Sequence, residues 1–327
     1  MKISIKITFL DEEGQKFFGV GPARLLHEIE ACGSLRAAAM QMNMAYTKAL
    51  KLVKQMEAAL GYPVVTRTIG GKDGGGSVLT PQGKRWLMRY ETYRLACVQE
   101  CQTLYEMLFP KTGCLIMASG MGIRFGGNKL MADFHGEPMI LRAIHATEGL
   151  FDKRVVVTRH EEIAKLCRDR GIEVILHNLP HRNDTIRCGL EALGEVECCL
   201  FCPGDQPLLR WETIEELLCC WEENREKIVR PICNGEPGSP VLFPKWAFPE
   251  LMSLPEGKGG GFVIKKHPDK LETRNITDPW ELVDADTPEI LEQLRRQYTL
   301  NKKAKEKNNE SYQKILNLTI RQEKMGF

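Results

Sequence analysis

The 327-residue sequence has no apolar run that approaches the roughly 18 to 20 residues needed to cross a bilayer. Its first segment, MKISIKITFLDEEG, alternates like a strand and reaches acidic residues too early for a secretory signal. Twelve cysteines without such a signal indicate reduced thiols rather than a disulfide framework. We therefore expect a cytoplasmic protein with no membrane partner.

The sequence also lacks a strong overall charge, because its net charge is only +2. That small value hides an uneven distribution. Residues 1–110 carry 14 basic and 10 acidic residues. Residues 111–294 carry 22 basic and 30 acidic residues, and residues 295–327 carry 9 basic and 3 acidic residues. A basic front, an acidic middle and a basic tail indicate modules with different partners. The length of the chain separately favours two domains.

Three helices and a two-stranded wing are predicted in the front module. PARLLHEIEACGS has helical spacing, Gly33 is placed to stop the helix, and Ser34 is placed to cap the next one, LRAAAMQMN. AYTKALKLVKQMEAAL follows as a third helix. The segments PVVTRTI and SVLT then predict two strands around the glycine-rich tip GGKDGGG, and helical periodicity resumes to about residue 108.

This arrangement resembles the N-terminal winged helix-turn-helix of molybdate-responsive ModE-type regulators, which are related to LysR-type heads. The resemblance rests on GSLRAAAMQMNMAYTKALKLVKQME and GGGSVLTPQGK. It implies that the third helix enters the DNA major groove and that the wing contacts backbone phosphates. The implied DNA-binding residues are Tyr46, Thr47, Lys48, Lys51, Arg67 and Lys72. The alternative is a dimerisation module without DNA contact, and a homodimer is possible under both interpretations.

The second module begins with CLIMASGMGIRFGGNKL, a buried strand followed by a glycine-rich loop. A dinucleotide-binding motif requires a third glycine where this chain has Phe125. A P-loop requires Gly-Lys-Ser/Thr, but Asn128 separates Gly127 from Lys129 and Leu130 follows. Both motifs are therefore excluded.

The same stretch resembles nucleotidyltransferases of the molybdenum-cofactor type, whose first strand leads into Leu-Ala-Ala-Gly-x-Gly-x-Arg-Phe-Gly-x-x-Lys. The matching residues are Met117, Ala118, Ser119, Gly120, Gly122, Arg124, Phe125, Gly126 and Lys129. Glycines let backbone N–H groups approach a triphosphate, and two cations neutralise charge as pyrophosphate leaves. The resemblance implies nucleotide binding by Ala118, Ser119, Gly120 and Gly122, and catalytic roles for Arg124 and Lys129.

Downstream segments extend this resemblance. RVVVTR and IEVILH flank a helical segment and predict a βαβ unit with parallel strands. HRNDTIRCGLEAL resembles the segment that holds the base, which places Asn183, Asp184 and Thr185 near the base or ribose. CCLFCPGDQPLL predicts a buried strand that ends at Asp205, where open α/β sheets bind ligands.

Asp205 is the expected catalytic carboxylate and first ligand of Mg²⁺, an ion that prefers oxygen ligands. Asp284 or Asp286 could supply the second ligand, and we favour Asp286 because it precedes Thr-Pro as in the family. NGEPGSPVLF resembles the acceptor-binding segment, which implies acceptor contacts by Gly238, Ser239 and Pro240. Ser239 stands where the family commonly has His.

The expected fold is thus an α/β, Rossmann-like nucleotidyltransferase domain with a mostly parallel sheet, preceded by a winged helix-turn-helix. The expected boundaries are residues 1–108 and 113–295, with a basic tail over 296–327. The resemblance implies transfer of CMP from CTP to a molybdopterin-type molybdenum cofactor. Two alternatives stay open: a regulator that only senses a nucleotide or cofactor, and a transferase of guanylyl groups or one acting on a sugar or alcohol phosphate.

Overall fold

The computed structural model describes residues 4–67 and 76–303. The chain divides into two compact units, Met1–Phe109 and Pro110–Phe327. Each unit has its own hydrophobic core.

The first unit is a winged helix-turn-helix, as the sequence predicts. Three helices precede the two wing strands, and a short hairpin precedes the helices. The elements are β1 (Phe9–Leu10), β2 (Lys16–Phe18), α1 (Val20–Cys32), α2 (Leu35–Gln41), α3 (Tyr46–Leu60), β3 (Val65–Arg67) and β4 (Ser77–Leu79). Strands β3 and β4 pair antiparallel, and the predicted wing residue Lys72 lies outside the described residues.

Two adjacent residues set the turn between α1 and α2. Gly33 adopts a left-handed φ of 65°, and its N–H donates to the carbonyl oxygen of Ile29. That backbone conformation strains residues with a Cβ, so glycine is suited to end the helix here. The hydroxyl of Ser34 accepts a hydrogen bond from the N–H of Ala37 and caps α2.

A long helix, α4 (Pro81–Leu108), completes the first unit. Its buried residues, Gly83, Leu87 and Tyr90, all lie in the first three turns. Tyr90 packs edge-on against Phe18, with ring centroids 4.9 Å apart. The remainder of α4 is predominantly exposed, including several of its apolar side chains.

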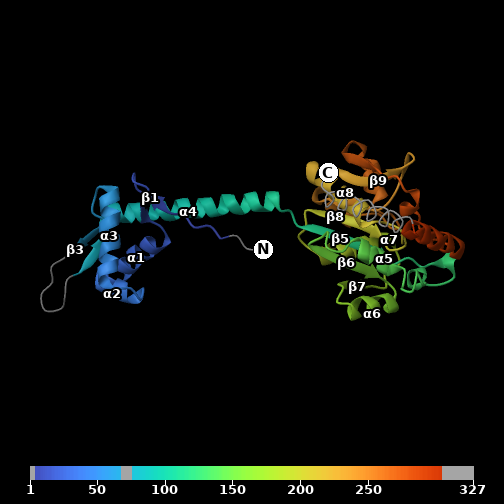
Figure 1. The fold of residues 1–327 in the computed structure, drawn as a ribbon, viewed down its shortest axis with the longest axis horizontal. Helices are drawn as coiled ribbons and strands as arrows, with labels where there is room; N and C mark the ends of the chain where they lie inside the picture. Colours follow the sequence, from blue (N-terminus) through green and yellow to red (C-terminus); the bar gives the residue numbers. More distant parts are fainter. Residues whose placement is uncertain (1–3, 68–75, 304–327) are drawn as a thin grey trace, which may run out of the picture. The chain divides into compact units, whose positions relative to one another are not determined.

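The second unit is organised around a mostly parallel sheet, as the sequence predicts. Its strand order is β10-β9-β11-β8-β5-β6-β7, with β12 also paired to β9. The strands are β5 (Thr112–Ala118), β6 (Lys153–Thr158), β7 (Val174–Leu176), β8 (Cys198–Pro203), β9 (Ile228–Cys233), β10 (Glu236–Pro237), β11 (Val241–Pro244) and β12 (Leu271–Asn275). Strands β8, β5, β6 and β7 are mutually parallel neighbours (Figure 1). Strand β11 pairs antiparallel with β8 and β9.

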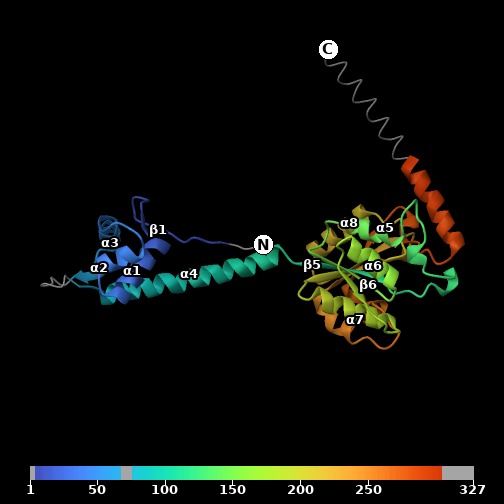
Figure 2. The same cartoon turned by 90° about the horizontal axis from the view of Figure 1, so that it is seen from below.

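Helices cover both faces of this sheet (Figure 2). The helices α5 (Ile140–Ala146), α6 (Glu161–Asp169) and α8 (Trp211–Glu223) pack on one face. The helices α7 (Arg182–Leu193), α9 (Phe248–Met252) and α10 (Gly261–Lys266) pack on the other. Because successive side chains of a strand point to opposite faces, each central strand contributes to both cores.

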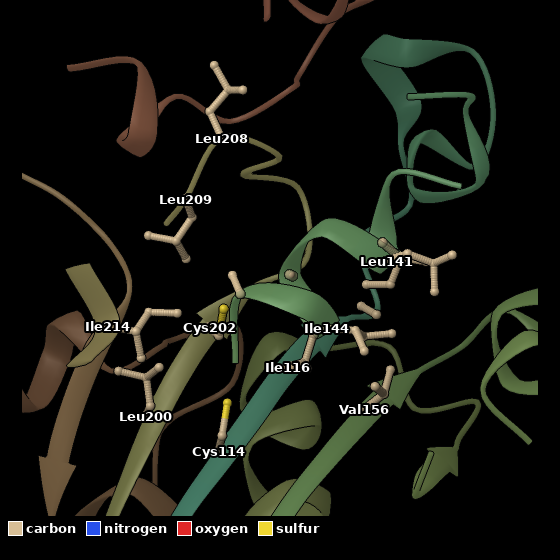
Figure 3. Packing of buried hydrophobic residues seen from close by; sticks show 14 of the residues in the cluster. Cys114, Ile116, Leu141, Ile144, Val156, Leu200, Cys202, Leu208, Leu209 and Ile214 are labelled. Atoms are coloured by element: carbon tan, nitrogen blue, oxygen red, sulfur yellow. The ribbon is translucent and has the colours of Figure 1, made fainter. Parts of the chain in front are cut away.

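The core under α5 illustrates this alternation (Figure 3). Cys114 and Ile116 of β5 lie in that core, whereas Leu115 between them packs on the opposite face. Ile116 is buried together with Val156 of β6 and Leu200 of β8. These apolar strands hold the loops that follow them in fixed positions at the carboxyl edge of the sheet.

The buried cysteines contribute to the core rather than to disulfides. All twelve are free thiols. Cys199 and Cys202 are fully buried in β8, and burial raises the pKa of Cys202 to about 12. These two residues therefore act as small hydrophobic side chains.

Residues 288–303 form a helix at the end of the described part of the chain, and the rest of the predicted basic tail lies outside the described residues. Over residues 4–67 and 76–303, each helix is either too short or too polar to span a membrane.

Candidate functional site

A cavity of about 440 Å³ opens at the carboxyl edge of the parallel strands. Three loops meet there, one after β5, one after β8, and one between β7 and α7, because parallel strands end at the same edge of a sheet. The lining includes Ser119, Gly120, Lys129, Arg159, His181, Arg182, Thr185, Asp205, Ser239, Asp284 and Asp286. Residues that the sequence places far apart are thus brought to one pocket.

The loop after β5 closes on itself around Gly122. This residue has a left-handed φ of 59°, and a Cβ built on it would lie 2.0 Å from the carbonyl oxygen of Gly127. A short 3-10 turn, Ile123–Phe125, follows directly. Only glycine permits this approach, so Gly122 fixes the shape of the loop that carries Arg124 and Lys129.

Ser119 is held by a histidine that the sequence analysis did not single out. The backbone N–H of Leu179 donates to Nδ1 of His177, at 3.2 Å, which leaves the ring proton on Nε2. Nε2 lies 2.9 Å from the hydroxyl of Ser119, which in turn donates to the carbonyl oxygen of Val157. His177 thereby connects the loop after β7 to the loop after β5.

Burial lowers the pKa of His177, and the nearby charge of Arg159 lowers it further, with the Asp184 carboxylate opposing both. The neutral imidazole is therefore favoured. The hydrogen bond from Leu179 also requires the neutral form, because a protonated Nδ1 cannot accept it.

Lys129 is the centre of the charged cluster. Its ammonium nitrogen lies 2.6 Å from Oδ2 of Asp205 and 2.7 Å from Oδ1 of Asp286. Its side chain is 11% exposed, so the ammonium is largely removed from water. The sequence predicts all three residues for the site, and the structure places them in direct contact.

Opposing effects act on the pKa of Lys129. Burial lowers it, but the charges and hydrogen bonds of Asp205 and Asp286 outweigh that effect and leave the pKa raised. The hydrogen bond from Lys129 lowers the pKa of Asp286, against a smaller effect of burial, and the charges of Lys129 and Arg124 add to the lowering. The contacts therefore favour a charged lysine and an ionised Asp286.

Asp284 adds a third carboxylate next to this pair. Burial raises its pKa, the charge of Asp205 raises it further, and a hydrogen bond from Gln206 at 2.9 Å opposes the increase. The pKa of Asp284 is thus raised first by burial and second by the neighbouring charge of Asp205.

The carboxylates fit the needs of a magnesium ion. Mg²⁺ is usually held by one or two carboxylates together with substrate phosphates. Asp205 and Asp286 offer two such groups on either side of Lys129. In the described part of the chain, no group of three His, Cys, Asp or Glu side chains is arranged to hold a metal by itself. A metal held by Asp205 and Asp286 would take its remaining oxygen ligands from substrate phosphates or from water.

Arg124 lies next to Asp286, which lines the cavity, but is not itself one of the lining residues. Its side chain is 82% exposed, and its guanidinium lies 3.8 Å from Asp286. It is thus free to reach a phosphate group that enters the cavity, whereas Lys129 is fixed inside.

Of the three predicted base-binding residues, Asn183, Asp184 and Thr185, one lines the cavity. Thr185 lines the cavity, and its hydroxyl lies 3.4 Å from Nε2 of His177. The amide oxygen of Asn183 accepts a hydrogen bond from the N–H of Gly257. Asp184 is buried, accepts from the N–H of His181 and pairs with Arg187, so it stabilises the start of α7.

The loop after β5 contributes backbone groups as well. The carbonyl oxygen of Ala118 accepts from the hydroxyl of Thr158, and that of Gly120 accepts from the ring of His160. Ser119 and Gly120 line the cavity.

In the predicted acceptor segment, Ser239 lines the cavity. The carbonyl oxygen of Gly238 is held by Arg230, a residue of β9 that the sequence analysis did not select. Pro240 follows Ser239 and directly precedes β11. Arg159, His181 and Arg182 also line the cavity. They lie in the segments RVVVTR and HRNDTIRCGLEAL, but the sequence analysis gave them no role, because their meeting in one cavity depends on the strand order.

The first unit presents a second candidate surface on α3. Tyr46, Thr47, Lys48 and Lys51 are all exposed, opposite the buried Ala49, Val53 and Met56. Arg36 of α2 lies over the ring of Tyr46, 5.9 Å from its centroid, and adds a cation that the sequence analysis did not include. Arg67 is exposed at the end of β3. The surface is polar and positively charged, as contact with a nucleic acid requires.

Comparisons with known proteins divide the chain in the same way. Residues 114–271 match the family described as MobA-like NTP transferase domain, and residues 23–84 match the bacterial regulatory helix-turn-helix proteins of the LysR family.

Among curated relatives, a molybdenum-pterin-binding protein, MopB, of Rhodobacter capsulatus is 42% identical over 72 residues, which are 22% of this chain and 27% of the relative. A 3-deoxy-manno-octulosonate cytidylyltransferase of Francisella tularensis is 29% identical over 112 residues, 33% of this chain and 45% of the relative. The chain thus matches less than half the length of either protein.

Among solved structures, a nucleotidyl transferase from Methanothermobacter aligns with a TM-score of 0.50 at 17% identity, over 58% of this chain and 99% of that one. At this identity the similarity concerns the fold. The fold similarity and the MobA-like match agree with the sheet and the loop after β5. The LysR-family match agrees with the helical front unit. Residues 114–271 form a MobA-like NTP transferase domain, joined in one chain to a LysR-family helix-turn-helix over residues 23–84.

Proposed function

We propose that this chain transfers CMP from CTP to a molybdopterin-type molybdenum cofactor and releases pyrophosphate. The observation that carries the proposal is the position of Lys129 between Asp205 and Asp286, inside a cavity at the carboxyl edge of the sheet. Buried positive charge beside two carboxylates suits a site that must bind both a triphosphate and its cation.

In the proposed reaction, an oxygen of the acceptor phosphate attacks the α-phosphorus of CTP. The bond from that phosphorus to the oxygen bridging to the β-phosphate breaks, and pyrophosphate leaves with the electron pair. The protein forms no covalent bond, because the acceptor supplies the nucleophile. Catalysis then consists of positioning and of stabilising charge on the phosphates, through Lys129 inside the cavity and Arg124 beside Asp286.

Asp205 and Asp286 would hold Mg²⁺, which would neutralise phosphate charge and polarise the phosphoryl oxygens when bound. The nucleotide would be held by Ala118, Ser119, Gly120 and Gly122 in the loop after β5, and by Asn183, Asp184 and Thr185 at the start of α7. Of these residues, Ser119, Gly120 and Thr185 have the most direct support, because they line the cavity.

Two kinds of relative support the choice of substrates. Several matched relatives are named cytidylyltransferases, which favours CTP as donor. The match to a molybdenum-pterin-binding protein favours a molybdenum-related role. A second candidate follows from the same names: the acceptor could be an acidic sugar, as in the named 3-deoxy-manno-octulosonate enzymes.

The decisive test is a panel of CTP, GTP, ATP and UTP with each candidate acceptor, the molybdenum cofactor and 3-deoxy-manno-octulosonate, read by pyrophosphate release. We expect CTP with the molybdenum cofactor to give the highest rate, because a pocket shaped for one base leaves polar groups unpaired with another. Equal or better use of GTP would assign the chain to guanylyl transfer. Release of pyrophosphate only with the acidic sugar would support the second candidate.

We further propose that the first unit binds DNA as a homodimer. The exposed cations of α3, Lys48 and Lys51, would contact the major groove and its phosphates. Beyond Tyr90, helix α4 carries exposed apolar side chains that a second copy could cover: Tyr93, Leu95, Val98, Leu104, Met107 and Leu108. Exposed apolar surface of this kind is typical of an interaction site.

A further inference from the structure

A second cavity, of about 380 Å³, adjoins the proposed nucleotide cavity. The two cavities share Met117, Arg182 and Ser239 as wall residues. The second cavity is lined by four cationic side chains and by no aspartate or glutamate. Its cations are Arg182, Arg230, Lys258 and Lys265.

Arg230 differs from the other three cations in its position. It lies within β9, which pairs with β10, β11 and β12, and it stands between the buried residues Val229 and Pro231. The side chains of Lys258 and Lys265 are exposed at the rim instead. Arg230 therefore places a positive charge on the floor of the cavity.

Among the described residues, the guanidinium of Arg230 has one hydrogen-bond partner, a backbone carbonyl. Its Nε and Nη2 both donate to the carbonyl oxygen of Gly238, at 3.0 and 2.7 Å. Burial lowers its pKa, and no described carboxylate pairs with it. By contrast, Arg210 and Arg274 each pair with glutamates. A half-buried arginine without a counter-charge is costly, and an anionic ligand would relieve that cost.

The position of Gly238 relates this cation to the acceptor. Gly238 immediately precedes Ser239, whose side chain borders both cavities. A molecule that reacts in the first cavity can therefore extend past Ser239 into the second. Its far end would meet Arg230, with Arg182, Lys258 and Lys265 around it.

We propose that the second cavity binds a negatively charged group of the acceptor that does not itself react, with Arg230 as its main partner. This inference rests on the proposed nucleotidyl transfer and specifies the acceptor class. The acceptor carries a carboxylate or a phosphate-like oxyanion in addition to its nucleophilic oxygen. Neutral alcohols and neutral sugars are disfavoured, because they would leave the buried guanidinium without a counter-charge.

The test compares Arg230→Met, which removes the charge, with Arg230→Lys, which keeps it. The matched control is Arg154→Met, because Arg154 is also a half-buried strand arginine that donates to a carbonyl oxygen, that of Ile144, and lies in β6 away from both cavities. Inorganic phosphate serves as the probe and is titrated calorimetrically into the full chain saturated with CTP.

We expect Arg230→Met to weaken phosphate binding at least about tenfold, since hydrogen bonds to charged groups contribute on the order of 1.5–3 kcal/mol. Arg230→Lys should retain part of the affinity, and the Arg154→Met control should bind phosphate like the unmodified chain. The affinity for CTP should stay within about twofold in all variants, because neither Arg230 nor Arg154 lines the proposed nucleotide cavity. In turnover assays, Arg230→Met should raise KM for the acceptor and leave KM for CTP unchanged.

Phosphate binding that does not depend on Arg230, or that is absent from the unmodified chain, would overturn the inference. Failure of the unmodified chain to bind CTP would instead contradict the proposed function. In that case phosphate is titrated without nucleotide, and its binding still has to depend on Arg230. If Arg230→Met lowered the melting temperature and CTP affinity together, a merely structural role in holding Gly238 would replace the proposal.

Discussion

The ammonium nitrogen of Lys129 lies 2.6 Å from Oδ2 of Asp205, so the loop after β5 and the loop after β8 are joined by a largely buried ion pair. Asp286 approaches the same nitrogen from a third segment. A contact of this kind serves two purposes. It holds the loops together in the protein alone, and in the proposed reaction it would gather the charges that a triphosphate and a divalent cation require.

Replacing Asp205 by alanine should lower turnover at least about a hundredfold, since metal stabilisation of developing charge contributes several kcal/mol. DNA binding should not change, because the proposed DNA-contacting residues belong to the first unit. Pyrophosphate release and a gel-shift assay measure the two effects. Asp169→Ala, an exposed position at the end of α6, is the control and should keep full activity. Near-normal pyrophosphate release from Asp205→Ala would remove this residue from the catalytic site.

Gly122→Ala should disrupt nucleotide binding more than Gly126→Ala. Both glycines have left-handed φ values, 59° and 79°, so both substitutions introduce similar backbone strain. Only at Gly122 would the new Cβ also meet a backbone atom, the carbonyl oxygen of Gly127, at 2.0 Å. We expect CTP affinity to fall at least about tenfold for Gly122→Ala and no more than about threefold for Gly126→Ala. Calorimetric titration measures both, and equal losses would contradict the role given to the Gly127 contact.

The stability of the second unit should fall as the pH is lowered through the ordinary pKa of histidine, near 6.5. The pKa of His177 is lowered in the folded state, so below that value the unfolded chain binds a proton that the folded chain does not. Protonation would also remove the hydrogen bond from Leu179 to Nδ1. The free energy of unfolding, measured in urea between about pH 7.5 and 5.5, should therefore decrease.

His177→Gln should make this pH dependence weaker, because glutamine does not titrate. His145→Gln, an exposed histidine on α5, is the matched control and should leave the dependence unchanged. The assigned role of His177 does not survive if the two variants show the same slope of stability against pH.

Lys48→Glu combined with Lys51→Glu should abolish specific DNA binding and retain catalysis. Lysine contacts to phosphates release counterions, so the affinity of the unmodified chain for a palindromic site should fall steeply as salt rises. Selection from genomic fragments at low salt, with and without CTP and cofactor, followed by gel shift, measures binding. The control is Lys165→Glu, which changes an exposed charge on α6 of the second unit and should leave DNA binding intact.

If no fragment is enriched over random DNA in any of these conditions, the first unit does not read sequence. The exposed apolar residues of α4 would then favour the dimerisation alternative.

Much of the fold could be predicted because its signals are local. Gly33 and Ser34 end one helix and begin the next through bonds to residues within four positions, so the turn of the helix-turn-helix is visible in the sequence. The shape of the loop around Gly122 likewise depends on residues no more than seven positions apart. Asp205 could be placed at the sheet edge because a buried strand leads directly to it.

The remaining features depend on the order in which strands pair. Arg230 reaches its cavity because β11 lies antiparallel between β8 and β9, which brings β9 and the Gly238 segment beside the acceptor side of the site. His177 meets Ser119 only because β7 and β5 end at the same edge of the sheet. The sequence alone determined the two modules and the residues that carry charge. The tertiary structure decided which charges have partners, because contacts between distant segments follow from packing and strand order, which no local pattern encodes.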